Sequence, residues 1–156
     1  MKGAAGQALQ NANLPAACLT LEVTESVLME GIENAITTLN HIRDMGVTLS
    51  IDDFGTGYSS LSYLATLPID ALKVDKSFIE KMASDGNGSE IVKAIFKLGQ
   101  ALSKQVFAEG IETGAQLALL RELGCQFGQG YLLSRPVDAQ RASGVLHGRQ
   151  NGLAVA

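Results

Sequence analysis

Five segments of this chain have the composition of parallel β-strands, and each ends in carboxylate, amide or ammonium side chains. They are TLEVTES (residues 20–26), LSIDDFGTGYSS (49–60), ALKVDKSF (71–78), VFAEGIET (106–113) and FGQGYLLSRP (127–136). Apolar residues at helical spacing lie between them, which indicates a parallel α/β fold. In a (β/α) barrel, polar groups at the carboxyl ends of successive strands form the active site. We therefore predict a site at that end of the strands.

The alternation within the strands favours a barrel over an open doubly wound sheet. Along residues 47–52 (VTLSID), apolar side chains face one way and small or polar ones face the other, and residues 19–24 and 71–75 alternate similarly. An open doubly wound sheet would be apolar on both faces, because helices cover both. A barrel whose interior becomes a polar pocket explains the pattern better.

The chain has 156 residues, whereas a closed (β/α)₈ barrel needs about 250. We therefore predict a single, incomplete TIM-like (β/α) barrel over residues 1–148 and a frayed tail over residues 149–156. Strands are expected at residues 19–24, 47–52, 71–75, 105–109 and 126–131. Helices are expected at residues 3–11, 32–42, around 61–64, and at 90–102, 115–123 and 138–147, with Gly46 and Gly124 as C-caps.

Composition narrows the class of protein. The formal net charge of −4 argues against binding to a nucleic-acid polymer, which would need a basic surface. No apolar run reaches membrane-spanning length, so no membrane contact is expected. Cys18 and Cys125 form neither a metal-ligand pattern nor a disulfide framework. A cytoplasmic protein with reduced thiols is therefore expected.

The acidic candidates are Glu22, Asp52, Asp53 and Glu109. Carboxylates gathered in one cleft repel one another and need a cation, and with two histidines in the chain the ligands would be oxygens, which suit Mg²⁺, Mn²⁺ or Ca²⁺. Glu22 and Asp52 lie about one βα unit apart, so they would occupy equivalent strand ends. The alternative for each residue alone is an ordinary helix cap or loop carboxylate.

Other polar residues extend this candidate site. Lys73 and Asp75 share a strand face, where the lysine could orient a water near a metal or form a structural pair with the aspartate. The loop with Gly55, Thr56 and Gly57 could contact a phosphate or close as a lid, or simply turn the chain. Gln129 could touch substrate or be a structural amide. Metal-assisted phosphodiester hydrolysis is the chemistry that these groups favour together.

In this order and spacing, LEVTES, DDFGTGYSSL, LKVDKSFI, AEGIET and QGYLLSRP resemble the EAL-domain family, phosphodiesterases that linearise the bacterial second messenger cyclic di-GMP. The resemblance runs from about residue 14 to residue 136. It implies a TIM-like barrel, a Mg²⁺ or Mn²⁺ cofactor, and hydrolysis of cyclic di-GMP to linear pGpG.

The resemblance also implies roles residue by residue. Glu22 and Asp52 match metal ligands, Asp53 matches the neighbouring carboxylate, and Lys73 matches the lysine that orients the water. Glu109 corresponds to a glutamate that acts as base or second-metal ligand, and Gln129 to a glutamine near the site. Glu25 resembles the glutamate that anchors the glycine loop, which couples substrate binding, metal binding and dimerisation.

The family's Glu-Ala-Leu signature does not occur in this sequence, nor does the asparagine that precedes LEVTES in the family by one strand. About five of the eight strands are therefore expected, as in the carboxyl-terminal part of a barrel. Such a partial barrel exposes two sheet edges, so a homo-oligomer is expected. A catalytically inactive cyclic di-GMP-binding or protein-interaction module is the alternative function. Further sensory domains in a longer protein would be compatible with either.

Overall fold

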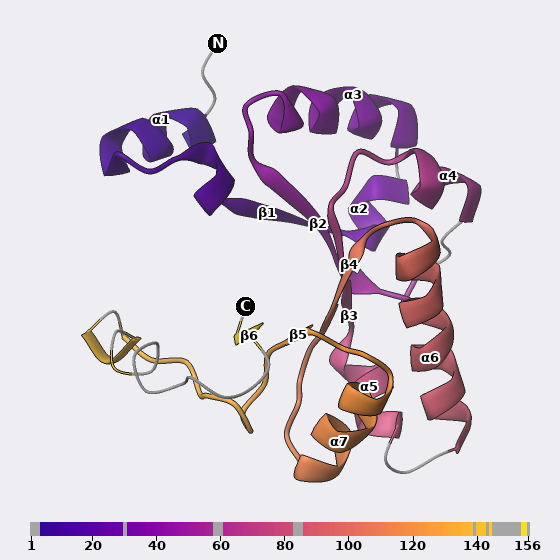
Figure 1. Cartoon of the computed structure of the whole chain (residues 1–156). Helices are drawn as coiled ribbons and strands as arrows, with labels where there is room; N and C mark the ends of the chain where they lie inside the picture. The colour runs from indigo at the N-terminus through magenta and orange to yellow at the C-terminus, as the bar shows by residue number, and fades with distance from the viewer. Residues whose placement is uncertain are drawn as a thin grey trace. The chain divides into compact units, whose positions relative to one another are not determined.

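The computed structural model describes residues 4–29, 31–57, 61–82, 86–138, 140–142, 144 and 154–155. The chain divides into two compact units, Met1–Leu72 and Lys73–Ala156. In Figure 1 the first is drawn in indigo to magenta and the second in pink to yellow. Helices and strands alternate within both units, which confirms the predicted α/β class.

The first unit contains a parallel pair of strands that begins with β1 (Thr20–Thr24) and ends with β2 (Thr48–Phe54). Their register runs from Thr20 opposite Thr48 to Thr24 opposite Asp52. The unit's helices are α1 (Ala4–Ala12), the 3₁₀ turn η1 (Ala16–Cys18), α2 (Glu25–Met29), α3 (Ile32–Arg43) and α4 (Leu61–Thr66).

The core of the first unit forms where α3 meets β2. Leu39 of α3 is buried, and so are Leu49 and Ile51, the two apolar residues that β2 presents on one face. Gly46 follows the helix with φ of +84°, a conformation that glycine adopts without steric cost, and its N–H bonds to the carbonyl of Arg43. The predicted C-cap and strand parity are thus confirmed here.

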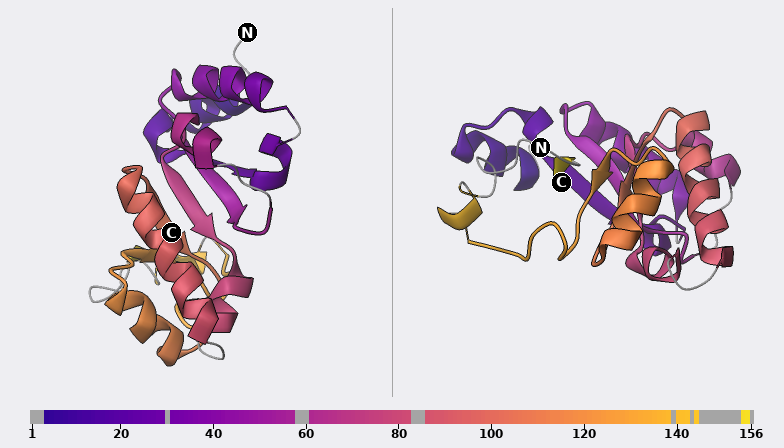
Figure 2. Two further views of the ribbon diagram at one scale, coloured as in Figure 1. Left: turned by 90° about the vertical axis from the view of Figure 1, so that its right-hand side faces the viewer. Right: turned by 60° about the horizontal axis from the view of Figure 1, so that its bottom comes forward.

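The second unit includes the end of β3 (Ala71–Val74), together with β4 (Gln105–Ala108), β5 (Phe127–Gly128) and β6 (Ala154–Val155). β5 pairs in parallel with both β4 and β6. The helices are α5 (Lys76–Met82), α6 (Gly86–Ala101) and α7 (Gly114–Glu122). α5 packs against α6 and also contacts α7, as the two views in Figure 2 allow the reader to follow.

One sequence prediction was wrong in detail, and two helices were not predicted. The last predicted strand, residues 126–131, is shortened to Phe127–Gly128, because the chain leaves the sheet and turns around Gly130. A Cβ at Gly130 would lie 2.2 Å from the backbone of Ile111, so the turn presses directly on that segment. Of the tail expected to fray, the structure describes only residues 154–155, which pair with β5, and the expectation for the tail stays a prediction. The helices α2 and α5 were not predicted at all.

Half of the residues of the predicted helix 138–147 lie outside the described part of the chain. Residues 140–142 and 144 are helical. Asp138 starts this turn, since its carboxylate accepts a bond from the N–H of Arg141 and its carbonyl accepts one from Ala142. Across the described ranges, we find no helix with both the length and the apolar character needed to cross a bilayer.

Candidate active site

The second unit brings three predicted site residues into contact at the ends of successive strands. Lys73 lies in β3, Glu109 directly follows β4, and Gln129 directly follows β5. The Lys73 ammonium lies 2.6 Å from Oε1 of Glu109, and Nε2 of Gln129 donates to the same oxygen at 2.7 Å. We call these three residues the lysine–glutamate network. Two donors on one carboxylate oxygen fix the orientation of the Glu109 side chain.

The lysine–glutamate network is well shielded from water. The Lys73 and Glu109 side chains are only 8 % and 14 % exposed. A buried charge is costly unless it is paired and hydrogen-bonded, so the ion pair supplies what burial of the lysine requires. The ion pair therefore holds the Lys73 side chain in place.

Backbone hydrogen bonds continue past the strand ends and hold the backbone of the residues that carry this network. The N–H of Glu109 donates to the carbonyl of Val74, the N–H of Gln129 to that of Ala108, and the N–H of Ile111 back to Gln129. Gly110 has φ of +69°, and a Cβ there would lie 2.4 Å from Cβ of Lys76. Only glycine allows the chain to pass so closely beside α5.

Asp75 has a structural contact in this unit. Its Oδ1 accepts a hydrogen bond from the N–H of Ser77 at 3.0 Å, across the first turn of α5. This is a helix-capping contact, whereas the alternative offered from the sequence for Asp75 was a structural pair with Lys73. A contact of Asp75 with substrate stays a prediction.

The first unit carries the acidic candidates. The register of β1 and β2 places Glu22 opposite Ser50 and Thr24 opposite Asp52, so alternation puts Glu22 and Asp52 on the same face. Carboxylate oxygens of Asp52 and Asp53 lie within 4.8 Å of each other. Asp53 has φ of +54°, which interrupts the strand alternation that would otherwise turn neighbouring side chains apart.

Glu25 anchors the glycine loop in the same unit. Its side chain is 1 % exposed, and Oε2 accepts a hydrogen bond from the N–H of Gly55 at 2.9 Å. A Cβ at Gly57 would lie 2.8 Å from Oε1 of Glu25. The hydroxyl of Thr56 donates to the carbonyl of Asp53 at 2.8 Å. The loop is therefore held against Glu25, while its continuation over residues 58–60 lies outside the described part.

The donor set of the first unit fits a hard divalent cation. Glu22, Asp52 and Asp53 offer oxygen atoms only, which Mg²⁺ and Mn²⁺ prefer over softer ligands. Ser50, 2 % exposed and on the face shared with Glu22 and Asp52, has a buried hydroxyl for which the described residues offer no hydrogen-bond partner. Buried hydroxyls are normally paired, so this face is suited to a ligand or an ordered water.

Sequence analysis did not single out Ser50 or Gln116, two buried polar residues of these units. For Ser50, its place on the same strand face as Asp52 was the available signal. For Gln116, the signal was the spacing Thr113-x-x-Gln116 before an apolar run, which is typical of a capping box. That capping box is present at the start of α7.

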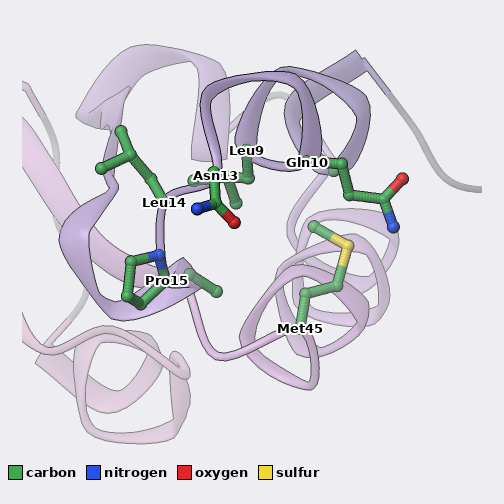
Figure 3. A pocket seen from close by; sticks show the side chains of 8 residues that line it. Leu9, Gln10, Asn13, Leu14, Pro15 and Met45 are labelled. Atoms are coloured by element: carbon green, nitrogen blue, oxygen red, sulfur yellow. The ribbon is translucent and has the colours of Figure 1, made fainter.

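Away from these residues, the first unit has a hollow between α1 and the turn after α3. Figure 3 shows Leu9, Gln10 and Asn13 of the α1 region facing Met45 across it. The residues that line it are Gly6, Leu9, Gln10, Asn13, Leu14, Pro15, Ala16 and Met45. None of them carries an ionisable side chain, so the lining side chains offer no group for acid–base chemistry.

Comparison with known proteins identifies the family. The EAL domain family profile matches residues 4–136. The chain is 55% identical over 130 residues to cyclic di-GMP phosphodiesterase NbdA of Pseudomonas aeruginosa, covering 83% of this chain and 17% of that protein. It therefore spans less than a fifth of the length of this relative.

Solved structures agree. The PaMucR phosphodiesterase in its cyclic di-GMP complex matches with a TM-score of 0.84 and 46% identity, over 87% of this chain and 55% of that chain. Klebsiella pneumoniae BlrP1 in its manganese and cyclic di-GMP complex matches with a TM-score of 0.78 and 34% identity, over 83% of this chain and 33% of that chain. These similarities confirm the predicted TIM-like (β/α)-barrel class. The chain belongs to the EAL domain family.

Proposed function

We propose that this chain is a cyclic di-GMP-specific phosphodiesterase domain that hydrolyses cyclic di-GMP to linear pGpG with Mg²⁺ or Mn²⁺. Membership of the EAL family and the similarity to NbdA and to the cyclic di-GMP complex of PaMucR support the substrate. The BlrP1 complexes with manganese and with calcium support a divalent cation. The observation that carries the proposal is the buried contact of Lys73 with Glu109 at the strand ends.

The chemistry of each side chain indicates its role in the proposed reaction. Glu22 and Asp52, with Asp53 beside them, would hold the cation; when bound, it supplies charge stabilisation for the phosphodiester and an acidic water. Lys73 would orient the attacking water with an ammonium that Glu109 and Gln129 hold in place.

Glu109 would act as base or as a ligand of a second cation, with its carboxylate oriented by Lys73 and Gln129. Gln129, Asp75 and the loop of Gly55, Thr56 and Gly57 would lie near the substrate. Glu25 fixes that loop through the N–H of Gly55.

Two further parts of the proposal are a cytoplasmic location and association with a second copy of the chain. β1 supports association, because its residues are exposed or half-buried throughout whereas those of β3 are all buried. A strand with open backbone groups and apolar side chains is a template for pairing. Light scattering at micromolar concentration should give a mass above the 16.4 kDa of one chain, and a monomer would contradict this part.

The deciding experiment measures conversion of cyclic di-GMP to pGpG with Mg²⁺ or Mn²⁺. Turnover should be abolished by Glu109→Ala and by chelation, and unchanged in Glu122→Ala, which removes an exposed carboxylate at the end of α7. No turnover from folded wild-type protein that still binds cyclic di-GMP would replace the proposal with the inactive binding module. Neither turnover nor binding would overturn both functions.

A further inference from the structure

Gln116 is a buried polar residue whose role the proposed reaction does not yet explain. It lies in the first turn of α7 and is 5 % exposed. Its side-chain Oε1 accepts hydrogen bonds from the backbone N–H groups of Glu112 at 2.8 Å and Thr113 at 2.9 Å. Its Nε2 donates to the carbonyl of Ile79 at 3.3 Å. A helix cap needs only the bond with Thr113. Capping therefore does not explain the bond to Ile79, which lies 37 residues away in sequence.

These bonds connect the two segments that carry the ion pair of the lysine–glutamate network. Ile79 lies in α5, which starts two residues after β3, the strand of Lys73. Glu112 and Thr113 end the segment that begins with Glu109. α5 and α7 are in contact, and Figure 1 shows them side by side in the second unit. Gln116 therefore ties the Glu109 segment to the helix that follows the lysine strand.

The hydrogen bonds of residues 109–113 show that the end of this segment is held by Gln116. At its start, the N–H of Glu109 donates to Val74, and in its middle the N–H of Ile111 donates to Gln129. At its end, both N–H groups are held by the single Oε1 of Gln116. Removing that oxygen would leave two partly buried donors without their acceptor, which favours movement of the segment.

We propose that Gln116 is a positioning residue that keeps Glu109 at its working distance from Lys73. The inference rests on the proposed phosphodiesterase function and concerns the same site. Gln116 touches none of the three residues of the lysine–glutamate network in the described contacts and acts through the backbone of Glu112 and Thr113. Since small displacements of catalytic groups reduce the rate of the chemical step more than substrate binding, loss of Gln116 should lower kcat and leave KM nearly unchanged.

Three variants test this in the full chain. Gln116→Met keeps the side-chain length and removes every hydrogen bond, and kcat should fall by about tenfold or more with KM changed less than about twofold. Gln116→Glu keeps oxygens for Glu112 and Thr113 but, when ionised, cannot donate to the carbonyl of Ile79, so kcat should lie between the values of wild type and Gln116→Met. Leu120→Val removes one methylene from a fully buried residue of the same helix and should leave kcat per folded molecule unchanged.

A second measurement does not need turnover. The Lys73 ammonium should give an observable ¹⁵N signal in wild type, because the ion pair slows its proton exchange, and the signal should disappear in Gln116→Met but persist in Leu120→Val.

An active wild type with an unaltered kcat in Gln116→Met would overturn the positioning role alone. An inactive wild type would overturn the proposed function, and the Lys73 signal would still decide whether Gln116 holds Glu109. A signal that survives in Gln116→Met would overturn the role in that case.

Discussion

In the second unit, Glu109 receives donors from Lys73 and Gln129 on one oxygen, whereas in the first unit Asp52 and Asp53 have carboxylate oxygens within 4.8 Å of each other. The first arrangement joins opposite charges within the protein itself. The second joins like charges, whose mutual repulsion a bound cation would offset. Both arrangements lie at the carboxyl ends of strands, but the first is held by an ion pair within the protein and the second would be stabilised by a bound cation.

This difference separates folding from ligand binding. The lysine–glutamate network should contribute to stability in the absence of any ligand, because breaking it leaves a buried charge poorly compensated. The carboxylates of the first unit should contribute further stability once a cation is bound. Under the proposed function, the protein preorganises one region and a bound cation would complete the other.

The largest expected effect is a change in the free energy of unfolding when one carboxylate charge is removed from the lysine–glutamate network or from the acidic pair of the first unit. Glu109→Gln should lower the free energy of unfolding by about 2–3 kcal/mol without metal, below the 3–5 kcal/mol typical of a broken buried pair because an amide oxygen can still accept from Lys73. Asp52→Asn is equally isosteric and should change it by less than about 0.5 kcal/mol, since it relieves repulsion with Asp53. Urea denaturation in chelator measures both, and equal losses would break the comparison.

The second effect is stabilisation by metal. At a Mn²⁺ concentration ten times its measured Kd, the free energy of unfolding of the wild type should rise by about 1.4 kcal/mol. Asp52→Asn should lose most of this gain. Glu33→Gln, which neutralises an exposed carboxylate in the first turn of α3, should keep all of it. Thermal unfolding with and without Mn²⁺ measures the gain, and a wild type that gains nothing would show that the carboxylates of the first unit do not bind the ion.

A smaller effect concerns the anchor of the glycine loop. Gly57→Ala places a Cβ 2.8 Å from Oε1 of the buried Glu25, which should cost about 1 kcal/mol and accelerate hydrogen exchange of the Gly55 amide. Gly114→Ala is the matched control, because a Cβ at the start of α7 meets nothing within 4 Å. If both variants exchange at the same rate, Glu25 does not hold the loop.

Sequence patterns predicted those parts of the fold that local chemistry decides. The apolar spacing of residues 32–42 and the glycine at 46 gave α3 nearly to its bounds, because periodicity and a C-cap act locally. α2 and α5 were missed because each follows its strand with at most one residue between them, so no loop signal separates strand from helix. β5 was predicted too long because only the approach of Gly130 to Ile111 ends it.

The site shows the same division. Parity and strand ends were enough to select Lys73, Glu109 and Gln129 as candidates. Their convergence on one oxygen depends on the pairing of β4 with β5, which residue spacing does not encode. Gln116 was overlooked because its sequence pattern indicates a cap, while its bond to Ile79 depends on how α5 and α7 pack.

The smallest effect distinguishes the units by their thiols. Cys18 in the first unit is exposed, whereas Cys125 in the second is buried and donates a hydrogen bond to the carbonyl of Phe127. Burial raises the pKa of the Cys125 thiol above its ordinary value, although the bonds with Phe127 and Ala108 oppose this. Since the thiolate is the nucleophile, Cys125 should react with a thiol reagent at pH 8 at least about 100-fold more slowly than Cys18, and faster as pH rises. Above about pH 8.5 the unfolded chain loses this proton first, so the shift then lowers stability. Mass spectrometry of Cys18→Ser against wild type assigns the fast phase, and a fast phase that survives in Cys18→Ser would mean that Cys125 is accessible.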